Sequence, residues 1–166
     1  FLDENHIQGN CVSKVRYGLY NNDELISLMT FGKFRKNLGN TPKNNCFELL
    51  RFCNKLNTNV VGSASKLFKH FSKTNEYEEI ISYADRSWSF SQNNIYQKLN
   101  FEFVRKTKPN YSYVVKDIRH NRFLFRKDVL ISEGFDSAKT EHEIMTEREI
   151  YRIYDSGSLL FEYVVK

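Results

Sequence analysis

The chain has 166 residues, of which 40% are hydrophobic and 15% aromatic. This length favours one domain, and the apolar content supports a sizeable core without metals or disulfides. No apolar run approaches the ~18 residues of a membrane span, which argues against a membrane protein. The net charge of +5 favours a polyanionic partner such as nucleic acid.

The cysteines and the N-terminus bound the class of protein further. Cys11, Cys46 and Cys53 lack the paired spacing of a zinc site, and the four histidines supply no second pair. We therefore expect no metal, and reduced thiols as in the cytosol. The first residues, 1–5, form neither a basic signal sequence nor an initiator methionine start, which favours a segment of a longer chain.

The first part of the chain predicts a helix and three strands. Two segments alternate like strands around a turn at residues 21–23, whose Asn and Asp tolerate left-handed backbone, so they predict a hairpin. The predicted elements are a helix at residues 3–8, strands at 15–20 and 25–31, a polar loop at 33–45 and a strand at 47–53.

Strands and helices alternate in the middle of the chain. Leu67, Phe68 and Phe71 recur at helical spacing, and Asn100 stands where a left-handed helix cap belongs. This order implies right-handed crossovers and a mixed α/β sheet with helices on both faces. The predicted elements are a helix at residues 63–73, a buried strand at 80–85, a helix at 91–99 and a strand at 101–105.

The last part predicts a strand, a helix and a closing hairpin. A strand at residues 111–115 follows the turn at Pro109. Thr140-x-x-Glu143 is a capping box that opens a helix at 140–149, and strands at 151–154 and 159–165 form the hairpin. We expect residues 1–115 to form the core and 116–166 an extension packed on the same domain.

Three ordered segments resemble the N-acetyltransferase (GNAT) superfamily. Asn59-x-x-Gly62-x-Ala64 opens a helix, residues 81–85 form the next strand, and 94–101 end a helix and begin a strand. In that superfamily a glycine-containing loop at a helix N-terminus cradles the pyrophosphate of coenzyme A, where small residues and the helix dipole favour phosphate. The family's Gln or Arg is Asn59 here, and its glycine is Asn100.

The resemblance implies the GNAT-like fold and an acyl-CoA such as acetyl-CoA as cofactor. Tyr96 would protonate the departing thiolate. The alternative interpretations are an ordinary strand-to-helix turn at Gly62 and a tyrosine that is part of the core. The implied cofactor-binding residues are Asn59, Val61, Gly62, Ser63 and Ala64.

A narrower resemblance, over residues 1–115, is to the phage Mom group, GNAT-shaped enzymes that modify adenine in DNA. The same segments plus the tail are similar to the C-terminal region of phage homing-endonuclease-like proteins. That similarity spans nearly the whole chain and implies a phage protein in the bacterial cytoplasm, with a nuclease domain before residue 1. The segments that carry these resemblances are residues 15–20, 28–32, 49–52, 64–67 and 82–85, and in the tail 139–145 and 151–155.

Resemblance to the Mom group implies that His6, Ser65 and Asp85 line the acceptor pocket. A histidine suits a proton shuttle, and Asp85 ends a buried strand, where α/β sheets place ligands. The loop of Arg86 and Trp88 offers stacking to a flipped base. The alternatives are a surface histidine, a capping serine and an internal ion pair between Arg51 and Asp85.

Basic residues gather in three predicted loops, 33–43, 105–108 and 119–127, and predict phosphate contacts. A solvated basic surface is the alternative. No nuclease signature is visible. Two hypotheses follow: an acyl-CoA-dependent transferase acting on a nucleobase, or a non-catalytic DNA-recognition domain of a homing endonuclease; acylation of a small molecule or protein ranks last. The candidate nucleic-acid-binding residues are Arg35, Lys36, Arg51, Arg86, Trp88, Lys106, Arg122 and Arg126.

Overall fold

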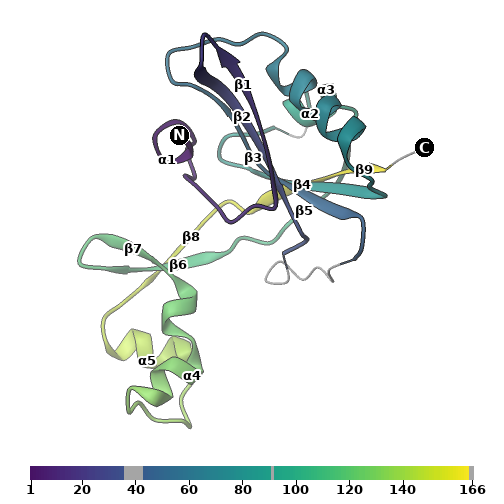
Figure 1. Cartoon of the computed structure of the whole chain (residues 1–166). Coiled ribbons are helices and arrows are strands. Elements are labelled where there is room, and N and C mark those ends of the chain that lie inside the picture. Colours follow the sequence, from purple (N-terminus) through teal and green to yellow (C-terminus); the bar gives the residue numbers. More distant parts are fainter. Residues whose placement is uncertain (36–42, 91, 165–166) are drawn as a thin grey trace. The chain divides into compact units, whose positions relative to one another are not determined.

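The computed structural model describes residues 1–35, 43–90 and 92–164. The chain divides into two compact units, Phe1–Lys106 with Ser158–Lys166, and Thr107–Gly157. The second unit is therefore an insertion in the first (Figure 1). These units differ from the predicted division at residue 115, because the last strand of the chain returns to the sheet of the first unit.

A six-stranded mixed sheet in the order β1-β2-β3-β4-β9-β5 forms the first unit. β3 and β4 are parallel, and the other neighbouring pairs are antiparallel. This arrangement confirms the predicted mixed α/β sheet. The strands are β1 (Val15–Asn21), β2 (Glu24–Gly32), β3 (Cys46–Asn54), β4 (Glu79–Asp85), β5 (Glu102–Lys106) and β9 (Ser158–Val164).

Local signals set the first hairpin and the crossover helix as predicted. Asn22 and Asp23 both adopt positive φ (47° and 65°), which suits the two-residue turn between β1 and β2. Helix α2 (Ser63–Thr74) connects β3 to β4 and buries Phe68 and Phe71. The Phe71 ring stacks on Phe31 of β2 at 3.7 Å between centroids, so an aromatic core joins helix and sheet.

Helices α1 and α3 are both shorter than predicted. α1 (Leu2–Asn5) stops before the predicted residue 8, because His6 has extended backbone and its imidazole accepts the N–H of Gln8. α3 (Ile95–Lys98) begins only after Asn94, whose side chain forms a capping box with Gln97. The predicted first residue of this helix, Ser91, lies outside the described residues. Asn100 has φ 66°, as predicted for a left-handed cap.

The second unit combines a three-stranded sheet in the order β7-β6-β8 with short helices. The basic stretch 119–127, predicted to be a loop, instead contains most of a strand and a 3-10 helix. The elements are β6 (Tyr111–Val115), β7 (Ile118–Asn121), the 3-10 helix η2 (Arg122–Phe125), α4 (Lys127–Ser132), α5 (Glu141–Glu147) and β8 (Arg152–Tyr154).

The predicted closing hairpin is wrong. β8 pairs with β6, whereas β9 lies between β4 and β5 in the other sheet. The reason is that Leu159, Leu160 and Phe161 are all buried, so both faces of this strand need cover that an isolated hairpin does not provide. β5 and β6 likewise do not pair across Pro109.

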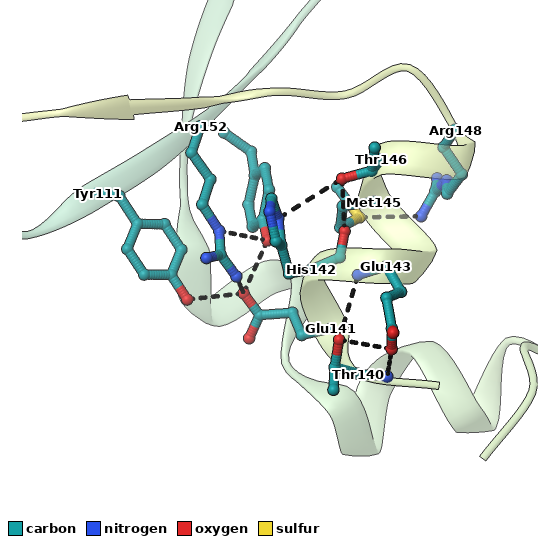
Figure 2. Close-up of polar contacts among 10 residues, drawn as sticks. Tyr111, Thr140, Glu141, His142, Glu143, Met145, Thr146, Arg148 and Arg152 are labelled. Atoms are coloured by element: carbon teal, nitrogen blue, oxygen red, sulfur yellow. Dashed lines mark hydrogen bonds and ion pairs between the residues drawn. The ribbon is translucent and has the colours of Figure 1, made fainter. Parts of the chain in front are cut away.

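Glu141 organises the polar interior of the second unit (Figure 2). Its Oε1 accepts hydrogen bonds from the Tyr111 hydroxyl at 2.8 Å and the Tyr113 hydroxyl at 2.9 Å, and lies 3.5 Å from Arg152 Nη2. Burial is the main cause that raises the pKa of Tyr113 to about 12. The predicted capping box of α5 is confirmed, since Thr140 and Glu143 hydrogen-bond reciprocally (Figure 2).

Candidate active site

The parallel strands β3 and β4 separate partway along their length. Their pairing runs from Cys46 opposite Glu79 to Leu49 opposite Ser82 and ends there, although both strands continue. At the last pair, the Ser82 hydroxyl donates a hydrogen bond of 2.9 Å to the Leu49 carbonyl. A cavity of about 140 Å³ lies beside the continuing parts of both strands and is lined by residues of each.

Five predicted site residues line this cavity, which we call the strand cavity. They come from four regions distant in sequence: the end of α1, β3, the end of β4 with its following turn, and α3. Met29, Leu49 and Leu50 are among the apolar residues of its wall. The five predicted residues are His6, Arg51, Asp85, Trp88 and Tyr96.

The guanidinium of Arg51 is held by main-chain carbonyls. Nε donates to the Gly9 carbonyl at 3.0 Å, and Nη1 to the Leu50 carbonyl at 2.8 Å. No salt bridge joins Arg51 to Asp85 within the described ranges, so the interpretation as an internal ion pair is wrong. Asp85 Oδ1 instead accepts the Ser87 N–H at 2.8 Å.

Burial at the cavity shifts the pKa of two of its residues, His6 and Tyr96. Burial lowers the pKa of His6, and the nearby positive charge of Arg51 lowers it further. Burial raises the pKa of Tyr96, against smaller opposing effects of Ser82 and Arg51. At neutral pH, His6 is therefore uncharged and Tyr96 keeps its phenolic proton.

The hydrogen bond that His6 accepts fixes the tautomer of its neutral imidazole. Gln8 N–H donates to Nδ1 at 3.0 Å, so the proton of the neutral imidazole belongs on Nε2. His6 is thus a hydrogen-bond donor in this conformation.

A second hollow of about 390 Å³, here the helix cavity, lies at the N-terminus of α2. It is lined by the predicted cofactor-binding loop together with Asn54 and Lys98. Phe52, Ile95 and Leu99 line both cavities, so the two hollows border the same apolar side chains. The loop residues are Asn59, Val60, Val61, Gly62, Ser63, Ala64 and Ser65.

The helix cavity has the features of an anion site. Gly62 is the N-cap of α2 at φ 75°, and no side chain caps the helix. A Cβ built on Gly62 would meet no atom within 4 Å, and the first turn carries no acidic residue. The Ser63 N–H donates to the Val60 carbonyl at 3.2 Å, so the N–H groups of Ala64 and Ser65 are the ones available to a phosphate, and Lys98 adds positive charge.

The two serines of this loop have different environments. Ser63 is buried, and its hydroxyl donates to Asn54 Oδ1 at 2.9 Å, so it fastens the loop to β3. Ser65 lines the helix cavity and is not among the residues of the strand cavity. The structure therefore does not bring Ser65 together with His6 and Asp85, because the first turn of α2 exposes it at the other hollow.

The predicted nucleic-acid-binding residues are dispersed. The Arg35 guanidinium binds the fully buried carboxylate of Glu48, with Nε 2.9 and 3.0 Å from its two oxygens, which is a structural role. Lys36 lies outside the described residues. Arg86 and Lys106 are exposed in the first unit.

Two more of these residues belong to the second unit. Arg122 lies over the Tyr111 ring at 5.1 Å, and Arg126 pairs with Asp128 at 3.3 Å. Both contacts leave the residues on the surface or partly exposed.

Sequence reasoning missed Gln8, Asn54 and Lys98. Gln8 lines the strand cavity, and the other two line the helix cavity. Only the position of Gln8 two residues after His6 offered a signal, because the other two come close to the site through the fold. In the residues that the structure describes, no three His, Cys, Asp or Glu side chains gather as metal ligands. None of its described helices has the length and apolar character to cross a membrane.

A mixed sheet with parting parallel strands, a crossover helix opened by glycine and a tyrosine beside the parting define a GNAT-like N-acyltransferase fold. The sequence matches the model of the Mom protein family over residues 1–156. The chain therefore belongs to the Mom protein family.

Two solved structures are similar to this chain. One is an N-acetyltransferase from Staphylococcus aureus Mu50, with 14% identity, coverage of 91% of this chain and 67% of the other, and a TM-score of 0.47. The second is a Bacillus subtilis acetyltransferase in complex with CoA, with 14% identity, 91% and 76% coverage, and a TM-score of 0.48. No curated protein matches the chain.

Proposed function

We propose that the first unit is an acyl-CoA-dependent transferase that acylates the amino group of a nucleobase in DNA. The observation that carries this proposal is the parting of β3 and β4 after Leu49 and Ser82. It sets a cavity with an acid–base pair, Asp85 and Tyr96, next to a cavity at an uncapped helix N-terminus. Membership in the Mom protein family supports DNA as the acceptor.

The residues of the helix cavity fit the phosphates of coenzyme A. The N–H groups of Ala64 and Ser65 would hold the pyrophosphate, and Lys98 would balance part of its charge. Phe52, Ile95 and Leu99 would give the pantetheine arm an apolar wall between the two cavities. Bound acyl-CoA supplies an acyl group activated as a thioester.

Asp85 and Tyr96 divide the proton transfers of the reaction. Acyl transfer would join the amino nitrogen to the acyl carbon and release the sulfur. Asp85 would accept the proton that the nitrogen loses, and Tyr96 would give its phenolic proton to the departing sulfur. The raised pKa of Tyr96 keeps that proton in place until it is needed, and the Nε2–H of His6 offers a hydrogen bond to the acceptor.

Calorimetric titration with acetyl-CoA tests the cofactor site. We expect saturable binding, and in Ser65→Asp a loss of about tenfold or more in affinity, since the added carboxylate repels the pyrophosphate. The same carboxylate favours the N-terminus of α2, so the variant should fold. Ser65→Asn is the neutral control and should bind within about twofold of the wild type. Absence of saturable binding at millimolar ligand would exclude the transferase.

A charge separation in the second unit favours an additional DNA-contacting role. Residues 107–127 carry an excess of positive charge, whereas residues 128–157 carry an excess of negative charge, with eight acidic and three basic residues. The segment 107–127 is thus suited to phosphates by its charge, whereas the segment 128–157 is not. The charged residues of the segment 107–127 are Lys108, Lys116, Arg119, Arg122, Arg126 and Lys127, against Asp117.

Gel shifts on duplex DNA at graded salt test whether this segment contacts DNA. A non-catalytic recognition domain of a homing endonuclease would also bind DNA in this assay. The double variant Arg119→Gln with Lys127→Gln should weaken binding and flatten the salt dependence, by about 0.9 in log–log slope per lost phosphate contact. Lys69→Gln with Lys73→Gln, on the exposed side of α2, removes equal charge elsewhere. Equal effects of the two double variants would contradict a role for this surface.

A further inference from the structure

The three-stranded sheet of the second unit has one face covered by helices and one open face. On the covered face, Tyr111 and Arg152 point toward Glu141 of α5 (Figure 2), and Tyr113 packs with Leu130 of α4. Because side chains alternate between the two faces of a strand, the residues between these lie on the other side. In the described part of the chain, none of them belongs to a buried core cluster. The open-face residues are Ser112 and Val114 of β6, Arg119 and Asn121 of β7, Ile153 of β8 and Tyr151 just before it.

The width of this open face fits one kind of groove. β6 lies in the middle and contributes the small side chains of Ser112 and Val114, with β7 and β8 on either side. Neighbouring strands are about 4.8 Å apart, so the three backbones span about 10 Å. The major groove of B-form DNA is about 12 Å wide and the minor groove about 6 Å. The sheet therefore matches the major groove and is too wide for the minor one.

Charge is divided between the two sides of the unit. β6, β7 and β8 contain no Asp or Glu, and Arg119 of the open face has no ion-pair partner among the described residues. The helices that cover the other face carry mainly acidic side chains, so a polyanion is favoured at the open face. The charged residues of α4 and α5 are Lys127, Asp128, Glu141, Glu143 and Glu147.

The open face also offers groups that can contact base edges. Asn121 Oδ1 accepts the Phe123 N–H at 3.0 Å, which fixes the amide and leaves its Nδ2 to donate. Within the described residues the Ser112 hydroxyl makes no hydrogen bond, and Ile153 is 40% exposed. In the major groove, base pairs present acceptors, donors and the thymine methyl group, which suit these side chains.

We propose that the open face binds in the major groove of duplex DNA. Ser112, Asn121 and Ile153 face the base edges, and Arg119 on the edge strand β7 contacts a flanking phosphate. This inference rests on the DNA-contacting role proposed above for the segment 107–127, and it adds the face and the groove. The surface shares no residue with the strand cavity or the helix cavity.

Modified duplexes test the groove. The full chain, without acyl-CoA, is titrated with a dye-labelled duplex of mixed sequence, and binding is followed by anisotropy. Bulky groups on C5 of the pyrimidines project into the major groove and should weaken binding about tenfold. Inosine in place of guanine removes only a minor-groove amino group and should leave the affinity within about twofold. Binding that the C5 groups leave unchanged would overturn the proposal.

An RNA duplex of the same sequence provides a second test of the groove. Its A-form major groove is too narrow for side chains to read, so we expect about tenfold weaker binding than to DNA. Equal binding to both duplexes would show that the protein recognises phosphates alone and would overturn the proposal.

Matched charge variants test the face. Ser112→Glu and Ile153→Glu each place a carboxylate on the open face and should weaken DNA binding about tenfold or more, whereas Ser112→Gln is the neutral control. Ser137→Glu makes the same charge change in the exposed loop between α4 and α5 and should stay within about twofold of the wild type. Hydrogen exchange of α5 verifies that each variant is folded. Equal losses in Ser137→Glu and the open-face variants would overturn the assignment.

The same titrations separate this inference from the role on which it rests. A wild-type chain that binds no duplex DNA even at low salt would overturn both. A chain that binds DNA but is insensitive to the C5 groups and to the open-face variants would overturn only the inference. DNA contact would then belong to the other basic residues of the segment 107–127.

Discussion

The two units of the chain are stabilised by different interactions. In the first unit, aromatic rings from sheet and helix form one large core, with Phe71 contacting Phe31, Phe47 and Tyr77. In the second unit only four residues form the buried apolar cluster, and a hydrogen-bonded network on Glu141 accompanies them. A unit this small buries less apolar surface, so directional polar contacts contribute a larger share of its stability.

The comparison explains where each unit can hold functional groups. Because the first unit is stabilised by its aromatic core, its strands can part and leave polar side chains beside a cavity. The second unit uses its inner arginine and tyrosines for structure, since Arg152 lies over Tyr111 at 4.2 Å and reaches Glu141. Its remaining basic residues are on the surface, where a phosphate can reach them.

The largest expected effect comes from truncating the aromatic core. Phe71 is fully buried, so Phe71→Ala should destabilise the first unit by about 3–5 kcal/mol, measured by urea denaturation. Amide hydrogen exchange should show that α5 of the second unit keeps its protection. Equal loss of protection in both units would show that they unfold together, which would contradict their separate stabilisation.

Removing the charge of Glu141 should have the next largest effect, on the second unit. Glu141→Gln weakens the acceptor of two tyrosine hydroxyls and separates Arg152 from its counter-ion, at a cost of about 2–3 kcal/mol. Thermal unfolding and hydrogen exchange of β6 measure this loss. Glu147→Gln, an exposed residue of the same helix paired with Lys139, is the control and should change stability by under about 0.5 kcal/mol.

Gly62→Ala separates stability from binding in the first unit. The positive φ of 75° at this residue disfavours any side chain, so we expect a loss of about 1–2 kcal/mol. Acetyl-CoA affinity should fall as well, because the loop shifts relative to the N–H groups of α2. A variant that loses stability but keeps full affinity would show that Gly62 serves the turn and not the ligand.

The smallest effect is a pH dependence that arises from His6. Its pKa in the folded chain lies below the unfolded value of about 6.5, so the unfolded state takes up the proton first. Stability should therefore be full at neutral pH and decline as the pH falls below that value. NMR titration of the imidazole measures the pKa directly, and Arg51→Met should raise it. An unchanged pKa in that variant would contradict the electrostatic contribution of Arg51.

Elements defined by local signals were predictable from the sequence. The turn at Asn22–Asp23, the helix after Gly62 and the capping box at Thr140 depend on neighbours in the chain, and all three are confirmed. Pairing between distant strands was not predictable, which is why β9 was assigned to the wrong partner. Its sequence shows that it is apolar on both faces but not which strands cover it.

Several residues of the candidate site could be predicted from the sequence, but their arrangement around one cavity could not. His6, Asp85 and Tyr96 were chosen for their chemistry or by resemblance, and the fold brings them to one cavity. That cavity exists because β3 and β4 stop pairing at Leu49, which no local pattern in either strand signals.

The ends of the second unit meet at a narrow neck. Asn110 and Asp155 exchange hydrogen bonds of 2.8 and 2.9 Å, and a Cβ on Gly157 would lie 2.7 Å from the Thr107 carbonyl oxygen. Once folded, the inserted unit therefore shortens the effective loop between β5 and β9 from residues 107–157 to a few residues. Loop-closure entropy makes this shortening worth about 2 kcal/mol to the pairing of β5 with β9. The folded insertion thus stabilises the pairing of the edge strand β5 with β9 by lowering the entropy cost of closing the loop between them.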